Sequence, residues 1–434
     1  MVGEICGWGR YPRIQADVRH FDNLDGLRNC LADAPRTIPY GLGRSYGDSA
    51  LAQEVIATRR FNSILAFDPN TGMVTCECGV SLAELIDAFL PRGWFPAVVP
   101  GTKFITVGGA IASDVHGKNH HRQGCFSQQV LDLQLMLADG HLLHCSPTQN
   151  RELFRATCGG MGLTGVILTA TLQLTQVPSS QIRQLVVPAR CLEEVLEAFE
   201  SYDHWSYSVA WIDCLASGEN LGRSLLILGE HETRGPLRQW PRRQWKLPCP
   251  LPGSLLNQYT VRLFNAAYHG VKTKRASESL VPLESFFFPL DAVQQWNLMY
   301  GRRGFTQYQL VLPKDAGCVG LKQILKNLSR YGMGSFLAVL KLMGAENDNY
   351  LSFPLEGYTL ALDFKIEKRL FRLLDDLDRI VADHGGRIYL TKDARMSTAM
   401  FRRCYPRWRE FQTLRKGLGA HLKFASLQSM RLGI

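Results

Sequence analysis

PGTKFITVGGAIASDVHGKNHHRQG, residues 100–124, combines five glycines and three histidines with a short apolar core. Gly108 and Gly109 can adopt backbone angles closed to other residues, and without side chains they let the main chain approach a flat or phosphorylated ligand closely. The order of polar and apolar residues from 115 to 121 fits neither an amphipathic helix nor a buried strand. We therefore expect an ordered loop that lines a binding site.

Two further glycine-rich passages occur in the first 165 residues. GLGRSYGD, residues 41–48, is spaced GxGxxxG, which is not the dinucleotide fingerprint GxGxxG. Its backbone amides can still form a nest for a pyrophosphate, although a plain tight turn explains the spacing equally well. CGGMGLTG, residues 158–165, precedes a long β-branched strand that ends near Val177. Three such loops predict one long ligand threaded between several backbone segments.

The composition predicts a globular protein of two domains, because 434 residues exceed the size at which single cores stop growing. The twelve cysteines are scattered, and the chain starts without a signal-peptide region, so we expect reduced thiols and a cytosolic protein. Cys76 and Cys78 have no second cysteine pair or histidine at zinc-like spacing, so no metal site is expected.

The net charge of +10 raises the question of nucleic acid, but the basic residues are spread out and no zinc-finger or RNA-recognition motif occurs. No nucleic-acid partner is therefore expected. The densest basic segment, RGPLRQWPRRQWK at 234–246, includes Trp240 and Trp245. It is either a solvated loop with locally packed tryptophans or a contact with an anionic membrane surface. The Pro-rich stretch 236–253 is expected to be exposed.

Strands are expected within 37–66, at 73–80, from 165 to 177, at 307–313, at 358–366 and again from 387 to 396. Ser81 and Glu84 have the spacing of a capping box before a helix that ends at Pro91 to Gly93. Short and long helices are expected at 152–157 and 368–384. The last expected strand places Lys392 and Asp393 directly after an apolar run.

Six motifs taken together carry a family resemblance: GLGRSYGD, PGTKFITVGGAIASDVHGKNHH, LFRATCGGMGLTG, FTQYQLVLP, FLAVLKLMG and GRIYLTKDAR. In this order they resemble the flavin oxidoreductases of the vanillyl-alcohol oxidase fold, and within it the oxidases of decaprenylphosphoryl-β-D-ribose. The resemblance spans nearly the whole chain. It implies an α+β protein with a two-part FAD-binding (PCMH-type) domain, 1–180 and 387–434, and an antiparallel-sheet substrate cap, 181–386.

The resemblance also implies which residues hold the cofactor. The expected FAD contacts lie in the three glycine-rich loops and at one lysine: Gly41, Leu42, Gly43, Arg44, Ser45, Tyr46, Gly47, Asp48, Pro100, Gly101, Thr102, Thr106, Val107, Gly108, Gly109, Ala112, Ser113, His116, Gly117, Asn119, Gly159, Gly162, Leu163, Thr164, Gly165, Val166 and Lys392. Some members of the fold attach FAD through a histidine in the first glycine loop. Residues 41–48 contain none, so non-covalent FAD is expected.

Oxidising an alcohol by hydride transfer to flavin needs a proton acceptor for the hydroxyl and a positive group near the ring. Lys392 matches the family lysine for the second task, His116 is the imidazole placed for polar contact or proton transfer, and Tyr300 is a third catalytic candidate. Residues expected at the substrate are Lys118, Gln309, Lys341, Thr359, Ala361 and Asp363. The resemblance implies an asparagine and a cysteine at two positions where this chain has Thr359 and Ala361, so a covalent inhibitor that needs that thiol is expected to fail.

The implied activity is oxidation of the 2′-hydroxyl of a polyprenyl-phosphate-linked ribose to a keto sugar by hydride transfer to flavin N5, the first half of an epimerisation to arabinose. A partner NAD(P)H-dependent keto-reductase and a peripheral position at the inner face of the membrane would follow. Two alternatives stay open: an FAD enzyme for a soluble sugar, polyol or sugar lactone, and a non-catalytic basic binding protein that retained the fold.

Overall fold

Three large sheets organise the chain, which the computed structural model describes for residues 2–434 apart from 239–244, 253–256, 275–276 and 336. The first sheet has the order β1-β2-β4-β3, with β1 antiparallel to β2 and the other neighbours parallel. Its strands are β1 (Val2–Cys6), β2 (Arg13–His20), β3 (Ile38–Tyr40) and β4 (Glu54–Ala57).

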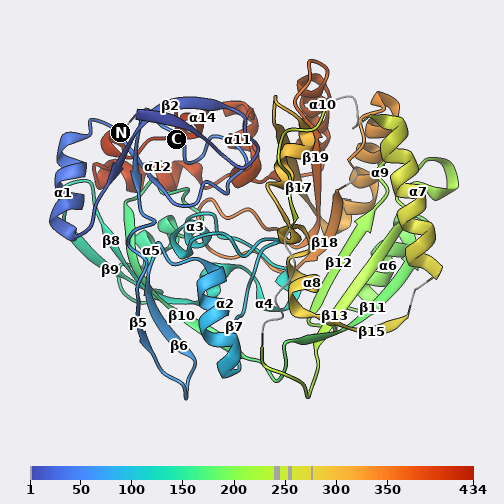
Figure 1. Ribbon diagram of the computed structural model, residues 1–434. Helices are drawn as coiled ribbons and strands as arrows, with labels where there is room; N and C mark the ends of the chain where they lie inside the picture. Colours follow the sequence, from blue (N-terminus) through green and yellow to red (C-terminus); the bar gives the residue numbers. More distant parts are fainter. Residues whose placement is uncertain (1, 239–244, 253–256, 275–276, 336) are drawn as a thin grey trace.

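The second sheet has the order β5-β6-β10-β8-β9, with β7 paired to the far end of β10. Its strands are β5 (Ile64–Phe67), β6 (Met73–Glu77), β7 (Trp94–Pro96), β8 (Val130–Met136), β9 (Leu142–Cys145) and β10 (Val166–Gln176). Helix α2 (Leu82–Phe89) begins with the capping box of Ser81 and Glu84, as the sequence predicted. Helices α1 (Leu24–Asp33) and α5 (Arg151–Thr157) complete this half, on the left of Figure 1.

The third sheet is antiparallel throughout, in the order β15-β11-β13-β12-β18-β19-β17-β20, and confirms the antiparallel sheet expected in the middle of the chain. Its strands are β11 (Gln181–Ala189), β12 (Tyr207–Ile212), β13 (Ser224–His231), β15 (Glu278–Pro282), β17 (Phe305–Pro313), β18 (Ala338–Met343), β19 (Gly357–Lys365) and β20 (Arg387–Ile388). A separate two-stranded pair joins β14 (Trp245–Lys246) to β16 (Val293–Gln294).

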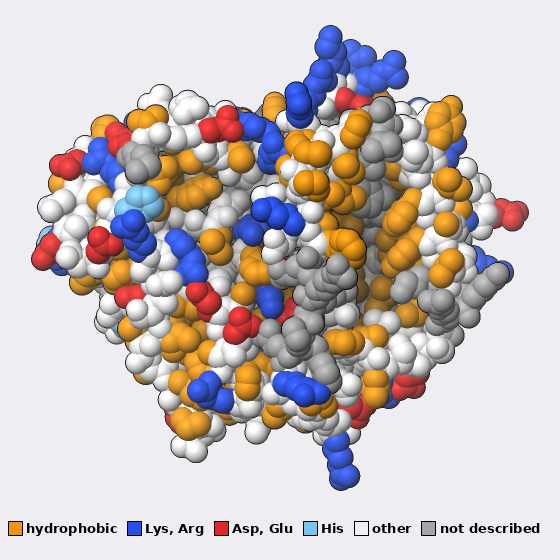
Figure 2. All heavy atoms as spheres, viewed as in Figure 1, with side chains coloured by type: hydrophobic (Ala, Val, Ile, Leu, Met, Phe, Trp, Pro, Cys, Tyr) orange, Lys and Arg blue, Asp and Glu red, His pale blue; other side chains and the backbone are white. Residues whose placement is uncertain are grey.

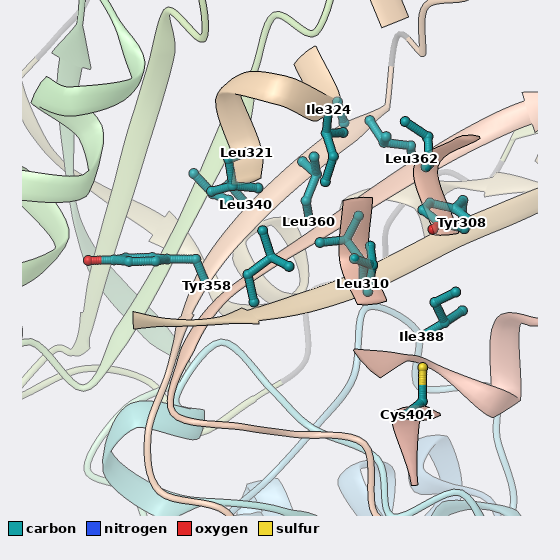
Figure 3. Close-up of a cluster of buried hydrophobic side chains, with 14 of the residues drawn as sticks. Tyr308, Leu310, Leu321, Ile324, Leu340, Tyr358, Leu360, Leu362, Ile388 and Cys404 are labelled. Carbon is teal, nitrogen blue, oxygen red and sulfur yellow. The ribbon is translucent and has the colours of Figure 1, made fainter. Parts of the chain in front are cut away.

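One face of this sheet is covered by α6 (Leu192–Ser201), α9 (Lys314–Tyr331) and α10 (Leu370–Asp383). Alternate residues of the central strands, among them Leu310, Leu340 and Leu360, fill the space beneath these helices and are fully buried (Figure 3). Because side chains alternate across a strand, the residues between them face the opposite side. The sheet therefore turns a second, polar face toward the other half of the molecule.

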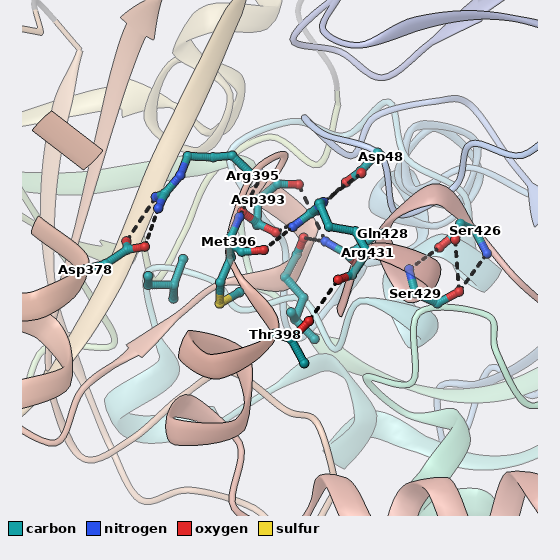
Figure 4. Close-up of polar contacts among 12 residues, drawn as sticks. Asp48, Asp378, Asp393, Arg395, Met396, Thr398, Ser426, Gln428, Ser429 and Arg431 are labelled. Carbon is teal, nitrogen blue, oxygen red and sulfur yellow. Dashed lines mark hydrogen bonds and ion pairs between the residues drawn. The ribbon is translucent and has the colours of Figure 1, made fainter. Parts of the chain in front are cut away.

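The C-terminal helices return to the N-terminal half of the molecule (Figure 1). They are α11 (Thr398–Cys404), α12 (Trp408–Gly417), α13 (Ala420–Lys423) and α14 (Leu427–Leu432). Arg431 forms ion pairs with Asp48 at 2.8 Å and with Asp393 at 2.9 Å, so one guanidinium joins both ends of the chain (Figure 4). Phe424 forms a bridge with Thr37 in the same region.

Two sequence predictions of local structure are wrong. The stretch 100–124 is not only loop: Val107–Ala112 is helix α3, capped by Thr106, and His120–Gln123 is the short helix α4. Tertiary packing of Val107, Ala110 and Ile111 outweighs the low helix propensity of the two glycines. The strand expected from 387 to 396 is only two residues long, and Lys392 lies in a 3-10 turn, Leu390–Lys392.

The remaining helices are α7 (Gln258–Lys274) and α8 (Leu283–Phe287). Within the described residues, no helix combines the length and hydropathy needed to cross a bilayer. Residues 239–244 of the basic tryptophan segment, which include Trp240, lie outside the described residues. Trp245, which is described, is exposed.

Candidate active site

The glycine-rich first turn of helix α3 lies in the stretch expected to contact FAD, and it forms one side of the candidate site, called its floor below. The Thr106 hydroxyl accepts a hydrogen bond from the amide of Gly109 at 3.1 Å and so caps the helix. Gly109 is exposed although Val107 and Ala110 beside it are buried, so the peptide surface of this turn is open to a ligand. A Cβ on Gly101 would meet nothing within 4 Å, which leaves a second open position on the same stretch.

The loop 41–48 lies against α3 and the 3-10 turn that carries Lys392. A Cβ on Gly41 would lie 2.6 Å from Oγ1 of Thr106, and one on Gly47 would lie 1.8 Å from the carbonyl of Asp393. Close packing therefore requires both glycines, Gly41 against the Thr106 side chain and Gly47 against the backbone of Asp393. The guanidinium of Arg44 stacks on Trp8 at 4.1 Å. The Asp48 carboxylate is engaged by Arg431, which gives it a structural role in this arrangement.

The third glycine-rich passage, 158–165, pairs with the end of α3. The amides of Gly159 and Met161 donate to the carbonyls of Ile111 and Ala112, each at 2.9 Å. Gly162 has a φ of +75°, which favours glycine. The side chains that follow are directed into the protein interior, where all are buried: Leu163, Thr164 and Val166. This passage thus supports the floor through its backbone, and Gly165 packs against the carbonyl of Met136.

The polar face of the eight-stranded sheet forms the opposite wall. Gln309 on β17 is paired with Ala361 on β19, and Lys341 on β18 is paired with Thr359. Asp363 follows two residues after Ala361 and is therefore on the same face. The register brings the five expected substrate residues of the sheet, Gln309, Lys341, Thr359, Ala361 and Asp363, onto one face.

His116 meets this wall through Gln309. The Nε2 atoms of the two side chains are 3.0 Å apart, and the same amide nitrogen is 3.2 Å from Oγ1 of Thr359. The Thr359 hydroxyl donates its single hydrogen to the carbonyl of Leu310 at 2.7 Å, so its oxygen can only accept from Gln309. This fixes the amide orientation, and the NH₂ group also donates to His116. The imidazole proton is consequently on Nδ1.

The Nδ1 atom of His116 is buried and has no hydrogen-bond partner among the described residues. Burial lowers the pKa of His116 well below 6.5, and the charges of Lys341, His120 and Lys392 act in the same direction. The ring is therefore neutral and presents an N–H for which the described part of the chain provides no acceptor. That geometry favours polar contact with a ligand over proton abstraction by this residue.

Asp363 lies at the centre of a second group. It accepts hydrogen bonds from Gln307 at 2.6 Å and from the Tyr300 hydroxyl at 3.3 Å. Lys392 places its ammonium 3.8 Å from the centre of the Tyr46 ring, a cation–π contact. Burial raises the pKa of Asp363 to about 7, although Gln307, Lys392 and Tyr300 oppose the shift.

The two lysines of the site also titrate near neutrality. Burial lowers the pKa of Lys392 to about 7, with Asp363 opposing and Lys341 adding to the effect. Burial alone lowers the pKa of Lys341 to about 8. Amines and a carboxyl group whose pKa values lie near pH 7 can exchange protons with a substrate hydroxyl, which is typical of a catalytic site.

Comparison with known proteins identifies the family of this chain. Residues 23–146 match the FAD binding domain family. The chain is 35% identical to decaprenylphosphoryl-β-D-ribose oxidase of Mycolicibacterium smegmatis, over 99% of this chain and 97% of the relative. The chain belongs to the decaprenylphosphoryl-β-D-ribose oxidase family. It is an FAD-dependent oxidoreductase, as the motifs predicted.

Two other relatives of this chain match it at lower identity, one of them over only part of its length. An uncharacterised protein of Streptomyces coelicolor is 32% identical over 82% of this chain and all of the relative. L-gulonolactone oxidase of Bos taurus is 33% identical over 37% of this chain and 36% of its own length. The α+β class with an FAD-binding domain of PCMH type is confirmed.

The residues present fit FAD. An exposed glycine turn, an open Gly101 and a buried unpartnered N–H on His116 all lie in the expected FAD stretch, 100–119. Two of the polar residues predicted in this region have internal partners instead. The Asn119 amide donates to the carbonyl of Ala97 at 2.7 Å, and the Lys118 ammonium donates to the carbonyls of Phe286 and Phe287.

Sequence reasoning missed three residues that shape this oxidase's site. Gln307 could have been found, because it is two residues before Gln309 and therefore shares its face. The ring centroids of Tyr389 and His116 lie 5.5 Å apart, and the Tyr389 hydroxyl donates to the carbonyl of Ser113. No local sequence pattern predicts this residue. Asp114 accepts from Ser352, Asn347 and Asn349 and so fastens the loop before β19 to the floor of the site, which only tertiary structure reveals.

A pocket leads from Tyr300 and Asp363 to the surface of the protein. It is lined by the buried Tyr300 and Asp363 and, farther out, by residues of three segments: Asn257, Gln258, Val261, Tyr331, Gly332, Met333, Gly334, Phe364, Lys365, Glu367 and Arg369. Asn257 and Arg369 are exposed, so the pocket provides a path between solvent and the polar face of the sheet.

Proposed function

We propose that this protein oxidises the 2′-hydroxyl of a polyprenyl-phosphate-linked ribose to the keto sugar, using FAD bound without a covalent link. The observation that carries the proposal is the similarity to an oxidase of decaprenylphosphoryl-β-D-ribose across 99% of the chain. That similarity includes the substrate-side strands as well as the FAD loops, and those strands bear Gln309, Lys341 and Asp363.

FAD supplies the hydride acceptor when it is bound. The residues of the chain would accept the proton, orient the reacting groups and exclude water. Lys392 and Asp363, with pKa values near 7, form the group that takes the proton of the sugar hydroxyl, and Tyr300 orients the carboxyl group. Lys341 adds positive charge to the pocket, and His116 donates through Nδ1. Burial by Tyr46 and the surrounding rings excludes water from these charges, which strengthens each interaction.

The FAD-binding domain in this proposal consists of residues 1–180 and 387–434, with the cap at 181–386. The ion pairs that join Arg431 to Asp48 and Asp393 support this division, because they link the proposed parts of one domain. Non-covalent FAD is supported by the absence of histidine from residues 41–48. A keto-reductase that consumes the keto sugar, and a cytosolic position peripheral to the membrane, belong to the same proposal.

A second candidate function is oxidation of a soluble sugar lactone. The similarity to L-gulonolactone oxidase favours it, but this similarity covers 37% of the chain. Steady-state assays with polyprenyl-phosphoryl ribose and with L-gulono-1,4-lactone separate the two, with the product identified by mass spectrometry. The proposal predicts a product two hydrogens lighter than the phosphoryl ribose and no turnover of the lactone. Turnover of the lactone alone would replace it with the second candidate.

A further inference from the structure

A polar contact and an aromatic contact are among those that fix helix α7 to the eight-stranded sheet. The amide of Asn265, which is fully buried, donates to Oδ1 of Asp213 at 2.7 Å. The Tyr268 and Trp211 rings lie 5.0 Å apart, and Val261 is buried on the same side. These contacts determine which face of the helix is turned to the protein and which is turned outward.

The outward face of α7 is apolar, the reverse of an ordinary surface helix. Tyr259, Leu263 and Val271 are spaced at multiples of four residues and so form one stripe, and they are 72%, 73% and 53% exposed. Hydrophobic side chains gather over α7 on the right of Figure 2. A group of large apolar side chains held on a fixed helix is typical of an interaction site.

The charge of α7 distinguishes between kinds of partner. The helix contains no aspartate or glutamate, and its charged residues are Arg262, Lys272 and Lys274. Arg262 is exposed beside the apolar stripe. A helix that contains no acidic residue and carries an exposed arginine beside an apolar stripe is complementary to an anionic lipid surface, where the apolar side chains enter the acyl boundary and basic groups meet the headgroups.

The position of α7 also connects this face to the active site. Gln258 and Val261, in the first turn of the helix, line the pocket that reaches Tyr300 and Asp363. A bilayer in contact with the stripe would therefore lie at the mouth of the pocket. A substrate whose lipid stays in the membrane could present its polar end to the site from there.

We propose that the outward face of α7, formed by Tyr259, Leu263 and Val271, docks onto an anionic phospholipid bilayer and admits a membrane-held substrate through the adjoining pocket. The docking itself is a property of α7, whereas the identity of the admitted molecule rests on the proposed function. The membrane contact considered for the segment 234–246 is thus assigned to a different element.

The test is flotation of the FAD-loaded, full-length protein with vesicles of phosphatidylcholine and phosphatidylglycerol in equal amounts. The triple variant Tyr259→Ser, Leu263→Ser, Val271→Ser should lose about tenfold or more in vesicle partitioning, because three apolar side chains no longer enter the lipid. The matched control changes three exposed apolar residues on other elements, Leu65→Ser, Val319→Ser and Leu422→Ser, and should float like the wild type.

Wild-type protein that stays in the lower fraction would overturn the proposal, as would an α7 variant that floats like the control. Loss of a wild-type dimer in the α7 variant, with no flotation of the wild type, would assign the face to a second copy of the chain and would also overturn it. A second assay tests the proposed function independently of membrane docking. It measures flavin reduction by a detergent-soluble short-chain prenyl-phosphoryl ribose. The α7 variant should keep this activity, and a wild-type enzyme that lacks it contradicts the proposed function while leaving the flotation result to decide the docking.

Discussion

Gln309 donates a hydrogen bond of 3.0 Å to Nε2 of His116, and Thr359 fixes the direction of that bond. The lone pair of Nε2 is engaged, and the buried Nδ1–H is the atom left for a ligand. The histidine of the glycine-rich stretch is therefore a directed hydrogen-bond donor. In the proposed function, proton acceptance is assigned to Lys392 and Asp363 instead.

The first prediction concerns this tautomer. In protein labelled with ¹⁵N-histidine, His116 should be neutral with the proton on Nδ1 throughout the range in which ordinary histidines titrate, because burial and neighbouring positive charge lower its pKa. Gln309→Glu should raise the pKa of His116, since a carboxylate stabilises the protonated ring, and should slow flavin reduction with FAD retained. A resonance for protonated Nε2 in the wild type would contradict this account of His116.

The second prediction concerns Lys392. Lys392→Met should fold and retain FAD, but its flavin should be reduced by substrate about 10²–10³-fold more slowly, which is the usual effect of removing one acid–base or electrostatic group. Lys118→Met is the matched control, because Lys118 is another enclosed lysine with a pKa lowered by burial to about 7. Its ammonium is engaged by two backbone carbonyls, so this variant should lose stability and keep the rate of reduction.

Rapid-mixing measurements of anaerobic flavin reduction distinguish the two lysines. Near-normal reduction in Lys392→Met would remove Lys392 from the mechanism. A large loss of rate in Lys118→Met, with FAD still bound, would show that the substrate competes for the ammonium that the carbonyls of Phe286 and Phe287 hold.

The third prediction follows from the pKa of Lys341, which burial lowers from 10.5 to about 8. The folded protein loses this proton before the unfolded chain does, so the cost of burying the charge is fully present below pH 8 and disappears as pH rises toward 10.5. Lys341→Met should therefore be more stable than wild type at pH 7 by about 1–2 kcal/mol, with the difference shrinking at pH 10. Urea unfolding of both proteins in the same excess of FAD measures it, and a difference independent of pH would refute the assignment.

The fourth prediction concerns Ala361, which is partly exposed opposite Gln309 in the register of β19 and β17. The wild type has no thiol at this point, so iodoacetamide should leave peptide 357–365 unmodified. Ala361→Cys should be alkylated there, because the positive charges of Lys341 and Lys392 favour the thiolate. Exposed Cys249 serves as the labelling control in both proteins. An unreactive Ala361→Cys would place this side chain outside the open part of the pocket.

Local pattern was sufficient for much of this molecule. Alternation along 307–313 and 358–366 predicted strands, and both form, as β17 and β19, with Gln309 and Asp363 on one face of the sheet. The spacing of Ser81 and Glu84 predicted a capping box that is present. Such features depend on neighbours within a few residues, and the sequence displays them directly.

Contacts between distant segments could not be predicted in the same way. Asp48 was expected at the pyrophosphate, yet its carboxylate is bound by Arg431, which is 383 residues farther along the chain. Helix α3 forms although two of its six residues are glycine, because its buried residues pack against other segments. The tautomer of His116 depends on Thr359, and neither position suggests the other in the sequence. The motif resemblance predicted the cofactor, whereas the direction of each hydrogen bond became clear only from the tertiary contacts.

Anaerobic stopped-flow measurement of flavin bleaching tests the central claim most directly. The FAD-loaded protein is mixed with polyprenyl-phosphoryl ribose, and in parallel with the same ribose deuterated at C2′. The account predicts that the flavin spectrum bleaches with the unlabelled sugar and bleaches several-fold more slowly with the deuterated one, because hydride leaves C2′. An oxidised spectrum that persists with the phosphoryl ribose, together with bleaching by L-gulono-1,4-lactone, would contradict it.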